Sequence, residues 1–150
     1  MCAVLNPLIA EGKTTAHRTP FDPDRMQSHY IASPYTICCR VAQEGGAILG
    51  FQALEGPDPA YGDTPEGWAF IASFVAPGQG GRGIGRSLFA ATLAAARAAG
   101  VVVIDATIRA DNVSGLGYYS ALGFTDHEVL KDVPLSDGTP VDRIRKRYDL

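Results

Sequence analysis

The stretch FVAPGQGGRGIGRSL, residues 74–88, restricts the fold of this chain more than any other part of it. Glycine fills five of the eight positions from 78 to 85, with an apolar run before them and an alanine-rich run after them. This order predicts a strand, a glycine-rich turn and the start of a helix. The first backbone N–H groups of a helix have no partner within the helix, and the helix dipole adds partial positive charge there.

The charge pattern around this turn predicts an anion site. No Asp or Glu occurs from residue 68 to residue 104, whereas Arg82 and Arg86 stand in and beside the turn. Glycine can adopt positive φ and lets a phosphate approach the backbone closely. We therefore interpret the stretch as a phosphate-binding loop at a helix N-terminus, rather than as a turn whose arginines are only solvated.

The other elements follow from apolar periodicity and from turn residues. Two apolar runs surround Glu44-Gly45-Gly46, which predicts a hairpin over residues 36–55. Asp22 and Pro23 suit the start of a helix that we expect to reach about residue 31. The remaining expectations are helices at 1–12, 86–99 and 114–123, and strands at 68–75, 101–108, 124–130 and 141–150. The order predicts an α+β fold around one mixed sheet, in a single domain of residues 1–150.

Composition excludes several classes of protein. The chain has 150 residues, 46% of them hydrophobic, and a formal net charge of -3, which gives no reason to expect nucleic acid or a membrane as partner. No apolar run reaches the ~18 residues of a membrane span. The first residues do not resemble a signal peptide, so we expect a cytoplasmic protein. Cys38 and Cys39 are neighbours that would point to opposite faces of a strand, and the scattered histidines predict no metal site.

Two general phosphate-binding patterns can be compared with the glycine stretch. A P-loop requires Lys and Ser or Thr after its last glycine, but Ile and Gly follow Gly83, so a P-loop is excluded. Gly78, Gly80 and Gly83 spell the dinucleotide fingerprint G-x-G-x-x-G, and Asp105 lies about 20 residues further on. The fingerprint falls at mid-chain, however, and few residues follow it to build a doubly wound sheet. A dinucleotide-binding domain stays open as a second interpretation.

A third pattern accounts for more of the chain. The spacing V-x-P-x-x-x-G-x-G-I-G over residues 75–85 resembles motif A of the Gcn5-related N-acetyltransferases, the GNAT family. Residues 112–124, NVSGLGYYSALGF, resemble motif B of that family, N-x-x-[AG]-x-x-x-Y-x-x-x-G-F. The resemblance covers residues 36–150 and is nearest to small-molecule N-acetyltransferases of the phosphinothricin type. It implies a mixed, mostly antiparallel sheet flanked by helices, in which the family's first strand is absent here.

The resemblance also implies a reaction and a set of contacts. Acetyl-CoA would be the co-substrate, and the primary amine of a small molecule would attack it directly in a ternary complex. The developing oxyanion needs a fixed donor, for which the family implies the backbone N–H of Phe74 or Val75. The residues expected to contact the cofactor are Phe74, Val75, Gly80, Gly81, Arg82, Gly83, Ile84, Gly85, Arg86, Ser87, Asn112 and Tyr119.

Tyr119 is the expected catalytic residue, because the resemblance places it beside the sulfur of CoA. A tyrosine has a pKa near 10 and a thiol near 8.5, so Tyr119 can pass a proton to the leaving thiolate slightly uphill. We expect this step to contribute about 10–100-fold to the rate. Tyr118 is expected to pack elsewhere on the helix, and Asn112 to cap the helix, to contact pantetheine, or both.

The chain departs from the family pattern in ways that affect its function. Gly80 stands where the family has Gln or Arg, so one side-chain donor to the pyrophosphate is missing unless Arg82 and Arg86 replace it. The stretch AFIASF, residues 69–74, lacks the acidic residue that phosphinothricin-type members often have there. The amine acceptor therefore stays unidentified. A CoA-binding module without turnover is the alternative function.

The general base is also open. Asp63, Glu66, His127 and Glu128 are candidates, although their residue types favour an ordinary surface charge at each position. An unpaired sheet edge would favour pairing of two copies, so a homodimer is an open expectation.

Overall fold

The computed structural model describes residues 1–60 and 62–150 in full and residue 61 by its backbone alone. Its elements are, in chain order, α1 (Cys2–Glu11), α2 (Pro23–Met26), the π-helical turn η1 (Gln27–Ile31), β1 (Thr36–Glu44), β2 (Ala47–Glu55), the 3-10 turn η2 (Pro59–Tyr61), β3 (Trp68–Val75), α3 (Ile84–Ala98), β4 (Val103–Arg109), α4 (Val113–Ala121), β5 (Thr125–Pro134) and β6 (Pro140–Asp149).

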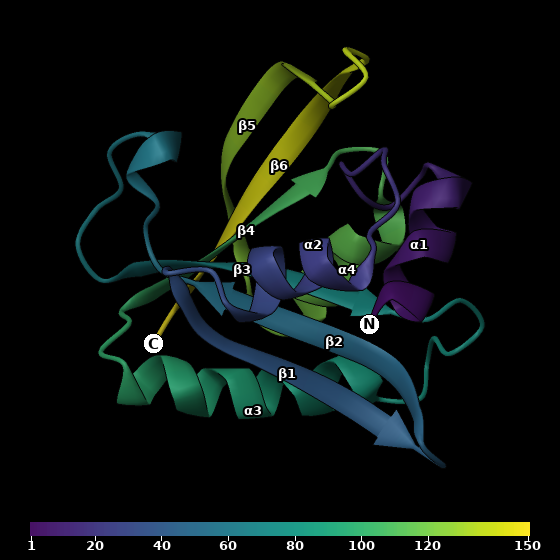
Figure 1. Ribbon diagram of the computed structural model, residues 1–150. Coiled ribbons are helices and arrows are strands. Elements are labelled where there is room, and N and C mark those ends of the chain that lie inside the picture. The colour runs from purple at the N-terminus through teal and green to yellow at the C-terminus, as the bar shows by residue number, and fades with distance from the viewer.

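The six strands form one mixed sheet in the order β1-β2-β3-β4-β6-β5. Neighbouring strands are antiparallel except β3 and β4, which are parallel and joined by α3. The predicted α+β fold with a mostly antiparallel sheet is confirmed, and β3 is a central strand. In Figure 1, α2 lies in front of the strands β2 and β3, whereas α3 runs along the other side of the sheet.

Both faces of the sheet are covered, because strand residues alternate between two hydrophobic clusters. Phe51 and Ala53 pack with the residues of α1, α2 and η1, whereas Leu54 packs with α3 and α4. The same alternation separates the adjacent cysteines: Cys38 contacts the α3 cluster and Cys39 the α1 cluster. Their predicted opposite orientation is confirmed, and all three cysteines are free.

Several predicted boundaries are wrong by about two residues, for reasons visible at the helix ends. Helix α3 begins at Ile84 instead of residue 86, since Gly83 takes φ 77° and serves as its N-cap. Strand β4 begins only at Val103, because the Val101 N–H still donates to the Ala96 carbonyl (3.0 Å) beyond Gly100 at φ 74°. This is the Schellman arrangement that a glycine after a helix allows.

The segment from residue 12 to residue 22 is irregular and crosses from α1 to α2. Asn6 holds its far end, since the Asn6 side chain donates to the Phe21 carbonyl (2.9 Å) and accepts from the Phe21 N–H (2.8 Å). At its start, Gly12 ends α1 at φ 74°. We call residues 12–18 the α1–α2 loop, which forms part of the site below.

The strands β3 and β4 separate soon after they pair. Their register runs only from Trp68 to Phe70 on β3, opposite 103–105 on β4. The Ala76 N–H donates to the Leu49 carbonyl on β2 (2.8 Å). Alternate residues of a strand direct their backbone groups to the same side, so those of Phe74 also point to β2 and those of Val75 point toward β4. Beyond residue 70, β3 therefore presents backbone donors and acceptors to an open gap beside β4.

No helix among the described residues has the length and hydropathy needed to cross a membrane. The cytoplasmic location stays a prediction.

Gly50 on β2 sets how closely β3 and α3 approach each other. A methyl group at Gly50 would lie 2.9 Å from the Phe74 carbonyl oxygen and 3.2 Å from Ile84 Cγ2. We expect Gly50→Ala to lower the free energy of unfolding by about 1–3 kcal/mol through overpacking. The matched control is Gly117→Ala in α4, where nothing lies within 4 Å and where Ala should raise stability by about 0.5–1 kcal/mol. Urea unfolding of both variants tests this, and a neutral Gly50→Ala would contradict it.

Candidate active site

A cavity of about 570 Å³ lies where β3 ends, where α3 begins and beside α4. Nine of the twelve residues expected to contact the cofactor line it. They are Phe74, Val75, Gly80, Gly81, Gly83, Ile84, Gly85, Arg86 and Asn112. The structure thus brings motif A and motif B to the two sides of one hollow, which we call the larger cavity.

The loop before α3 is shaped to receive an anion. Ser87 is the first residue whose N–H bonds within the helix, to the Gly83 carbonyl at 3.0 Å, so the amides of Ile84, Gly85 and Arg86 are free of helical partners. Gly81 and Gly83 both have φ 77°, and a Cβ at either would meet nothing within 4 Å. The space beside the loop is therefore open, and the donor set fits a pyrophosphate.

Arg82 and Ser87 do not line this cavity. The Arg82 Nη2 atom lies 2.9 Å from both carboxylate oxygens of Glu44 at the end of β1, and Nη1 bonds Gln79. Ser87 is exposed outside the cavity. A contact between Arg82 and the pyrophosphate requires that the ion pair with Glu44 first breaks.

Tyr119 is buried among aromatic rings, with Tyr118 at 4.9 Å and Phe124 at 5.0 Å between centroids. It lines only a second, smaller cavity. Its hydroxyl shares a hydrogen bond of 2.8 Å with Ser73 Oγ. Burial raises the pKa of Tyr119 well above the ordinary value of 10, so the hydroxyl holds its proton firmly.

The expectation that Tyr118 packs away from the site is wrong. Tyr118 lines both cavities, and its hydroxyl donates to the Gly85 carbonyl at 2.8 Å. Burial also raises the pKa of Tyr118. The prediction failed because neighbouring residues of a helix point about 100° apart, which suggested that only one of the two tyrosines could face the site. The spacing in the sequence does not show that the cavity is wide enough to reach both.

Gln52 is a site residue that the sequence analysis missed. Its side chain is fully buried and its Nε2 atom donates to Ser73 Oγ (2.7 Å) and to the Tyr118 hydroxyl (3.2 Å). It therefore connects Tyr118 to Ser73 on β3, which bonds the Tyr119 hydroxyl itself. The sequence feature that could have identified Gln52 is that it is a polar residue within the second apolar run of the predicted hairpin.

The smaller cavity has a volume of about 200 Å³ and adjoins the larger one. Thr14, Ser73, Asn112 and Tyr118 line both. The smaller cavity continues between the α1–α2 loop, the separated ends of β3 and β4, and β6. Its mouth into the larger cavity lies beside the open backbone edge of β3.

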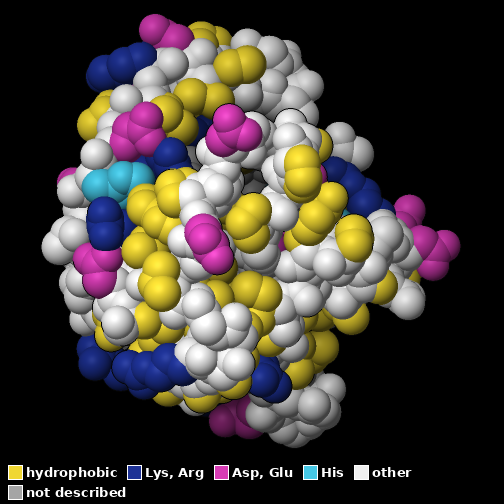
Figure 2. Space-filling view, turned by 90° about the vertical axis from the view of Figure 1, so that its left-hand side faces the viewer, with side chains coloured by type: hydrophobic (Ala, Val, Ile, Leu, Met, Phe, Trp, Pro, Cys, Tyr) yellow, Lys and Arg dark blue, Asp and Glu magenta, His cyan; other side chains and the backbone are white. Residues whose placement is uncertain are grey.

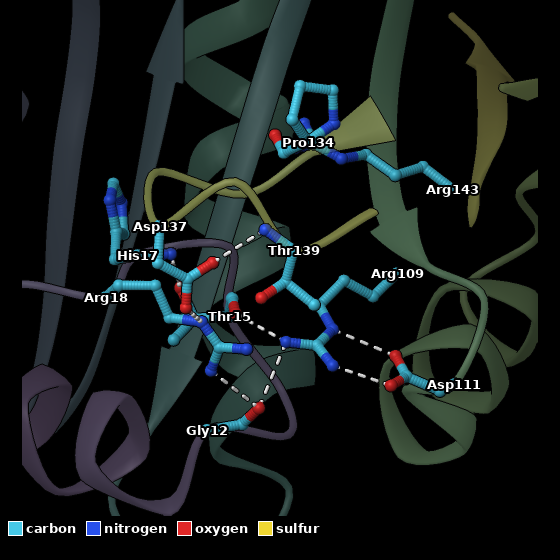
Figure 3. A network of polar contacts seen from close by, with 10 residues as sticks. All are labelled: Gly12, Thr15, His17, Arg18, Arg109, Asp111, Pro134, Asp137, Thr139 and Arg143. Atoms are coloured by element: carbon cyan, nitrogen blue, oxygen red, sulfur yellow. Dashed lines mark hydrogen bonds and ion pairs between the residues drawn. The ribbon is translucent and has the colours of Figure 1, made fainter. Parts of the chain in front are cut away.

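A network of polar contacts fixes the α1–α2 loop over this cavity (Figure 3). The Arg109 Nη1 atom donates to the carbonyls of Gly12 (3.0 Å) and Thr15 (3.2 Å), while Nε and Nη2 bond both carboxylate oxygens of Asp111. Asn112 caps α4 by accepting from the Gly115 N–H, as predicted. Its Nδ2 atom also donates to the Thr14 carbonyl (3.0 Å).

His17 attaches the same loop to η1. Its Nε2 atom lies 2.7 Å from the Tyr30 hydroxyl. Burial, followed by the charges of His29 and Arg25, lowers the pKa of His17 from 6.5 to about 4. The loop is therefore docked through a neutral imidazole.

The candidate bases lie away from both cavities. Asp63 and Glu66 belong to the segment at the left of Figure 1, whereas the loop after β3 lies at the right. On that left-hand side, acidic and basic side chains are interspersed rather than gathered by sign (Figure 2). Among the described residues, His127 pairs with Asp105 (2.7 Å) and Glu128 with Arg145 (2.6 Å), and none of the four candidates lines either cavity.

Asp105 decides against the dinucleotide interpretation. Its carboxylate is fully buried inside β4 and is occupied by His127 and Arg145. It lines neither cavity, so it is not available to a ribose beside the glycine loop.

An open strand edge beside an anion-binding helix start is the arrangement of a protein that binds an acyl-CoA. The chain matches the Acetyltransferase (GNAT) family over residues 7–124. It therefore belongs to the GNAT family, whose members are acetyl-CoA-dependent N-acetyltransferases. The sequence prediction of this family is confirmed.

Similar proteins agree with this assignment. The chain is 31% identical to a phosphinothricin N-acetyltransferase of Streptomyces coelicolor over 79% of this chain and 71% of the relative. It is 32% identical to a mycothiol acetyltransferase of Amycolatopsis mediterranei over 59% of this chain, but this spans only 30% of that protein. A protein from Salmonella typhimurium, solved with acetyl-CoA as its cofactor, has the same fold, with a TM-score of 0.81 and 21% identity over 99% of this chain and 86% of that one.

The positive φ of Gly83 yields a prediction about the anion loop. A non-glycine residue in this region costs about 1–2 kcal/mol, so Gly83→Ala should either strain the loop or refold it. We expect CoA to bind about tenfold more weakly, as measured by calorimetry. Gly100 after α3 has φ 74° and equally open space but lines neither cavity, so Gly100→Ala imposes the same backbone strain away from the loop and, as the matched control, should bind CoA as the wild type does. Equal affinity of both variants would contradict this account of the loop.

His17 yields a prediction about pH. Its pKa is about 4 in the folded chain and 6.5 as the ordinary value, so the unfolded chain takes up the proton first as pH falls. Stability is therefore complete above about pH 6.5 and decreases toward pH 4. His17→Gln keeps a polar partner for Tyr30 and removes this titration. The melting temperature of the wild type should fall more steeply than that of His17→Gln between these pH values, and parallel curves would refute the assignment.

Proposed function

We propose that this chain transfers the acetyl group of acetyl-CoA to the primary amine of a small molecule, by direct attack in a ternary complex. The observation that carries this proposal is the junction of the two cavities beside the open edge of β3. A thioester in the larger cavity and an amine in the smaller one would meet there. The name of the phosphinothricin relative supports a small acceptor, as does the volume of the smaller cavity.

The larger cavity would hold the CoA moiety by its phosphates and its chain. The free amides of Ile84, Gly85 and Arg86 would bind the pyrophosphate, with the Arg86 guanidinium adding charge. The pantetheine chain contains amide groups, which can pair with the exposed backbone of β3 as an added strand does. Asn112 stands at the junction, where it already holds α4 and the α1–α2 loop together.

Val75 is the better of the two candidates for the oxyanion donor. The Phe74 backbone points to β2, where its carbonyl lies close to Gly50, and is therefore not free. The Val75 N–H points into the gap toward β4. A fixed amide at this place would stabilise the negative charge on the thioester oxygen as the amine adds.

Tyr119 would act on the leaving group. Its hydroxyl lies at the smaller cavity beside Ser73, which lines both cavities. Because burial raises its pKa, full proton transfer to a thiolate is more uphill than for an ordinary tyrosine, at 1.36 kcal/mol for each pKa unit. Tyr119 would therefore stabilise the thiolate first by donating a hydrogen bond. As CoA leaves, the thiolate would take the Tyr119 proton, and the hydroxyl would regain one from the nitrogen that has attacked the thioester, so that Tyr119 ends the step protonated.

The acceptor must lose a proton without an obvious side-chain base. The smaller cavity is lined by hydroxyl groups, including those of Thr15, Ser73 and Thr107, and by Arg109 and Arg143. Positive charge disfavours protonation of a nearby amine and lowers its pKa. We propose that the amine enters as the neutral form, or loses its proton through water along these hydroxyls, before it attacks.

Binding and turnover together test this function. The melting temperature should rise with acetyl-CoA and with CoA but not with NAD, since a ligand that binds only the folded chain stabilises it. Thiol release should then depend on an added primary amine. CoA binding without turnover of any amine in a broad panel would refute the proposed reaction and support the non-catalytic CoA-binding alternative.

The two adjacent tyrosines provide a matched pair of variants. Tyr119→Phe should lower kcat about 10–100-fold and leave the affinity for CoA unchanged, because the lost group acts on the leaving thiolate. Tyr118→Phe removes the bond to the Gly85 carbonyl, so it should weaken CoA binding more than it lowers kcat. Steady-state kinetics and calorimetry measure both. A kcat loss confined to Tyr118→Phe would exchange the two roles.

A further inference from the structure

A chain of hydrogen bonds runs beside the junction of the two cavities. It consists of Gln52, Ser73, Tyr118 and Tyr119. Gln52 on β2 and Ser73 on β3 are partners in the sheet register, and α4 carries both tyrosines. Ser73 lines both cavities, whereas Tyr119 lines only the smaller one. What this chain of bonds can do chemically depends on which hydroxyl has a proton that no protein atom accepts.

The proton of Tyr118 is already held by the protein. The Tyr118 hydroxyl donates to the Gly85 carbonyl at 2.8 Å. A hydroxyl has one proton, so toward Gln52 the same oxygen can only accept. The Gln52 amide must therefore turn its NH2 group to Tyr118 (3.2 Å), although this leaves its Oε1 atom buried without a partner. Tyr118 is thus excluded as a proton donor to a ligand, and the orientation of the Gln52 amide is fixed.

The fixed amide determines what the Ser73 hydroxyl can do. The Gln52 Nε2 atom lies 2.7 Å from Ser73 Oγ and has no lone pair with which to accept, so Ser73 accepts from it. The other partner of Ser73 Oγ is the Tyr119 hydroxyl at 2.8 Å. In the part of the chain that the structure describes, neither hydroxyl has a further acceptor. Two protons therefore share one hydrogen bond, and one proton remains for a group in the cavities.

Amide formation needs such a proton at one atom and releases one at another. A neutral primary amine becomes positively charged at nitrogen when it adds to the thioester, and the leaving thiolate of CoA requires a proton. Burial raises the pKa of Tyr119, so a Tyr119 anion would be costly at every moment of the step. A second group that returns a proton to Tyr119 while Tyr119 gives one away would avoid this anion.

We propose that the Ser73 hydroxyl is a catalytic proton relay between the attacking nitrogen and Tyr119, and that Gln52 positions it. This proposal rests on the acetyl transfer proposed above and specifies how its protons move. Before the step, Ser73 donates to Tyr119, which leaves the Tyr119 proton for the thioester sulfur. A serine oxygen has two lone pairs. One accepts from Gln52, and the other is available to the amine, because Ser73 lines the cavity proposed for the acceptor.

The atoms and charges balance in one exchange. The carbon–sulfur bond of the tetrahedral adduct breaks with its electron pair going to sulfur, while the oxyanion re-forms the carbonyl. Sulfur takes the Tyr119 proton, the Tyr119 oxygen takes the Ser73 proton, and the Ser73 oxygen takes a proton from the nitrogen. The products are a neutral amide and the thiol of CoA. Both hydroxyls end protonated, with Tyr119 now donating to Ser73, and rotation of the two O–H groups restores the first arrangement.

A matched pair of variants at position 73 gives the first test. Ser73→Thr keeps the hydroxyl, and Ser73→Val has the same shape without it. With any amine that the wild type acetylates, we expect kcat of Ser73→Val to be about 10–100-fold below that of Ser73→Thr, at equal affinity for CoA. Thr92→Val removes a buried hydroxyl of α3 outside both cavities and should leave kcat unchanged. Equal kcat of the Thr and Val variants would overturn the relay.

Coupling between Ser73 and Tyr119 gives a second test, which a merely structural role would not pass. Ser73→Val combined with Tyr119→Phe should lower kcat no further than Tyr119→Phe alone, because both changes interrupt one relay. The single-turnover rate of the wild type should follow a curve against the deuterium fraction of the solvent, since several protons move together. The rate of Ser73→Val should follow a straight line. Losses that multiply in the double variant, or a straight line for the wild type, would refute the relay.

Gln52→Met tests the positioning role. Met fills a similar volume but has no donor, so the Ser73 hydroxyl could turn away from Tyr119. We expect kcat to fall about 3–10-fold, which corresponds to the loss of one orienting hydrogen bond and is less than for Ser73→Val. The deuterium dependence should stay curved, since the relay still operates in the fraction of molecules with the correct orientation. An unchanged kcat would show that Gln52 does not position Ser73.

The outcomes separate the relay from the function on which it rests. A slow Tyr119→Phe variant together with a fully active Ser73→Val variant would overturn the relay while the acetyl transfer stands. CoA binding without acetylation of any amine in a broad panel would overturn both. Should Ser73→Val fail to fold, Ser73→Ala and the deuterium dependence of the wild type still decide.

Discussion

The separation of β3 and β4 is the constraint on which the site depends. Only three residue pairs join these parallel strands, and beyond Phe70 the edge of β3 has no partner in the sheet. A strand edge that is left unpaired inside a protein requires a ligand or water to satisfy it. The gap would therefore allow a chain-like amide ligand to pair here and would bring its thioester beside Val75, as the proposed function requires.

Side chains from three elements form a hydrogen-bond network beside this gap. Gln52 on β2 bonds Ser73 on β3, which bonds Tyr119 on α4, while Tyr118 reaches the first turn of α3. The network is largely buried. Inside a protein, hydrogen bonds are stronger than in water, and a polar group without a partner lowers the stability of the fold. Gln52 thus connects the strand that carries the open amides with both elements that carry the family motifs. These contacts also orient the proposed acid, Tyr119.

The sequence predicted those parts of the site that depend on local chain geometry. The glycine loop, the start of α3 and the cap at Asn112 follow from φ preferences and from unpaired helix amides, and the structure contains all three. The sheet with its central strand also follows from apolar runs and turn residues. These features could be predicted because each is determined within a few residues of the chain.

Contacts between distant segments could not be predicted in this way. Arg82 stands within motif A, yet it faces Glu44, which lies 38 residues earlier. Arg109 and Arg143 were ordinary strand residues in the sequence, and only the antiparallel pairing of β4 with β6 brings them together. The two arginines differ because the Asp111 carboxylate pairs with Arg109, whereas Arg143 has no carboxylate partner among the described residues.

The positive charge in the smaller cavity affects whether the acceptor amine is protonated. An acceptor amine must be neutral to attack, and a cationic cavity favours that form. Arg109 is paired with the Asp111 carboxylate, whereas Arg143 has no carboxylate partner among the described residues. The charge of Arg143 would therefore leave positive potential beside an amine in the smaller cavity. On this argument the cavity needs no carboxylate or imidazole of its own, which accounts for the distance of Asp63, Glu66, His127 and Glu128 from the junction.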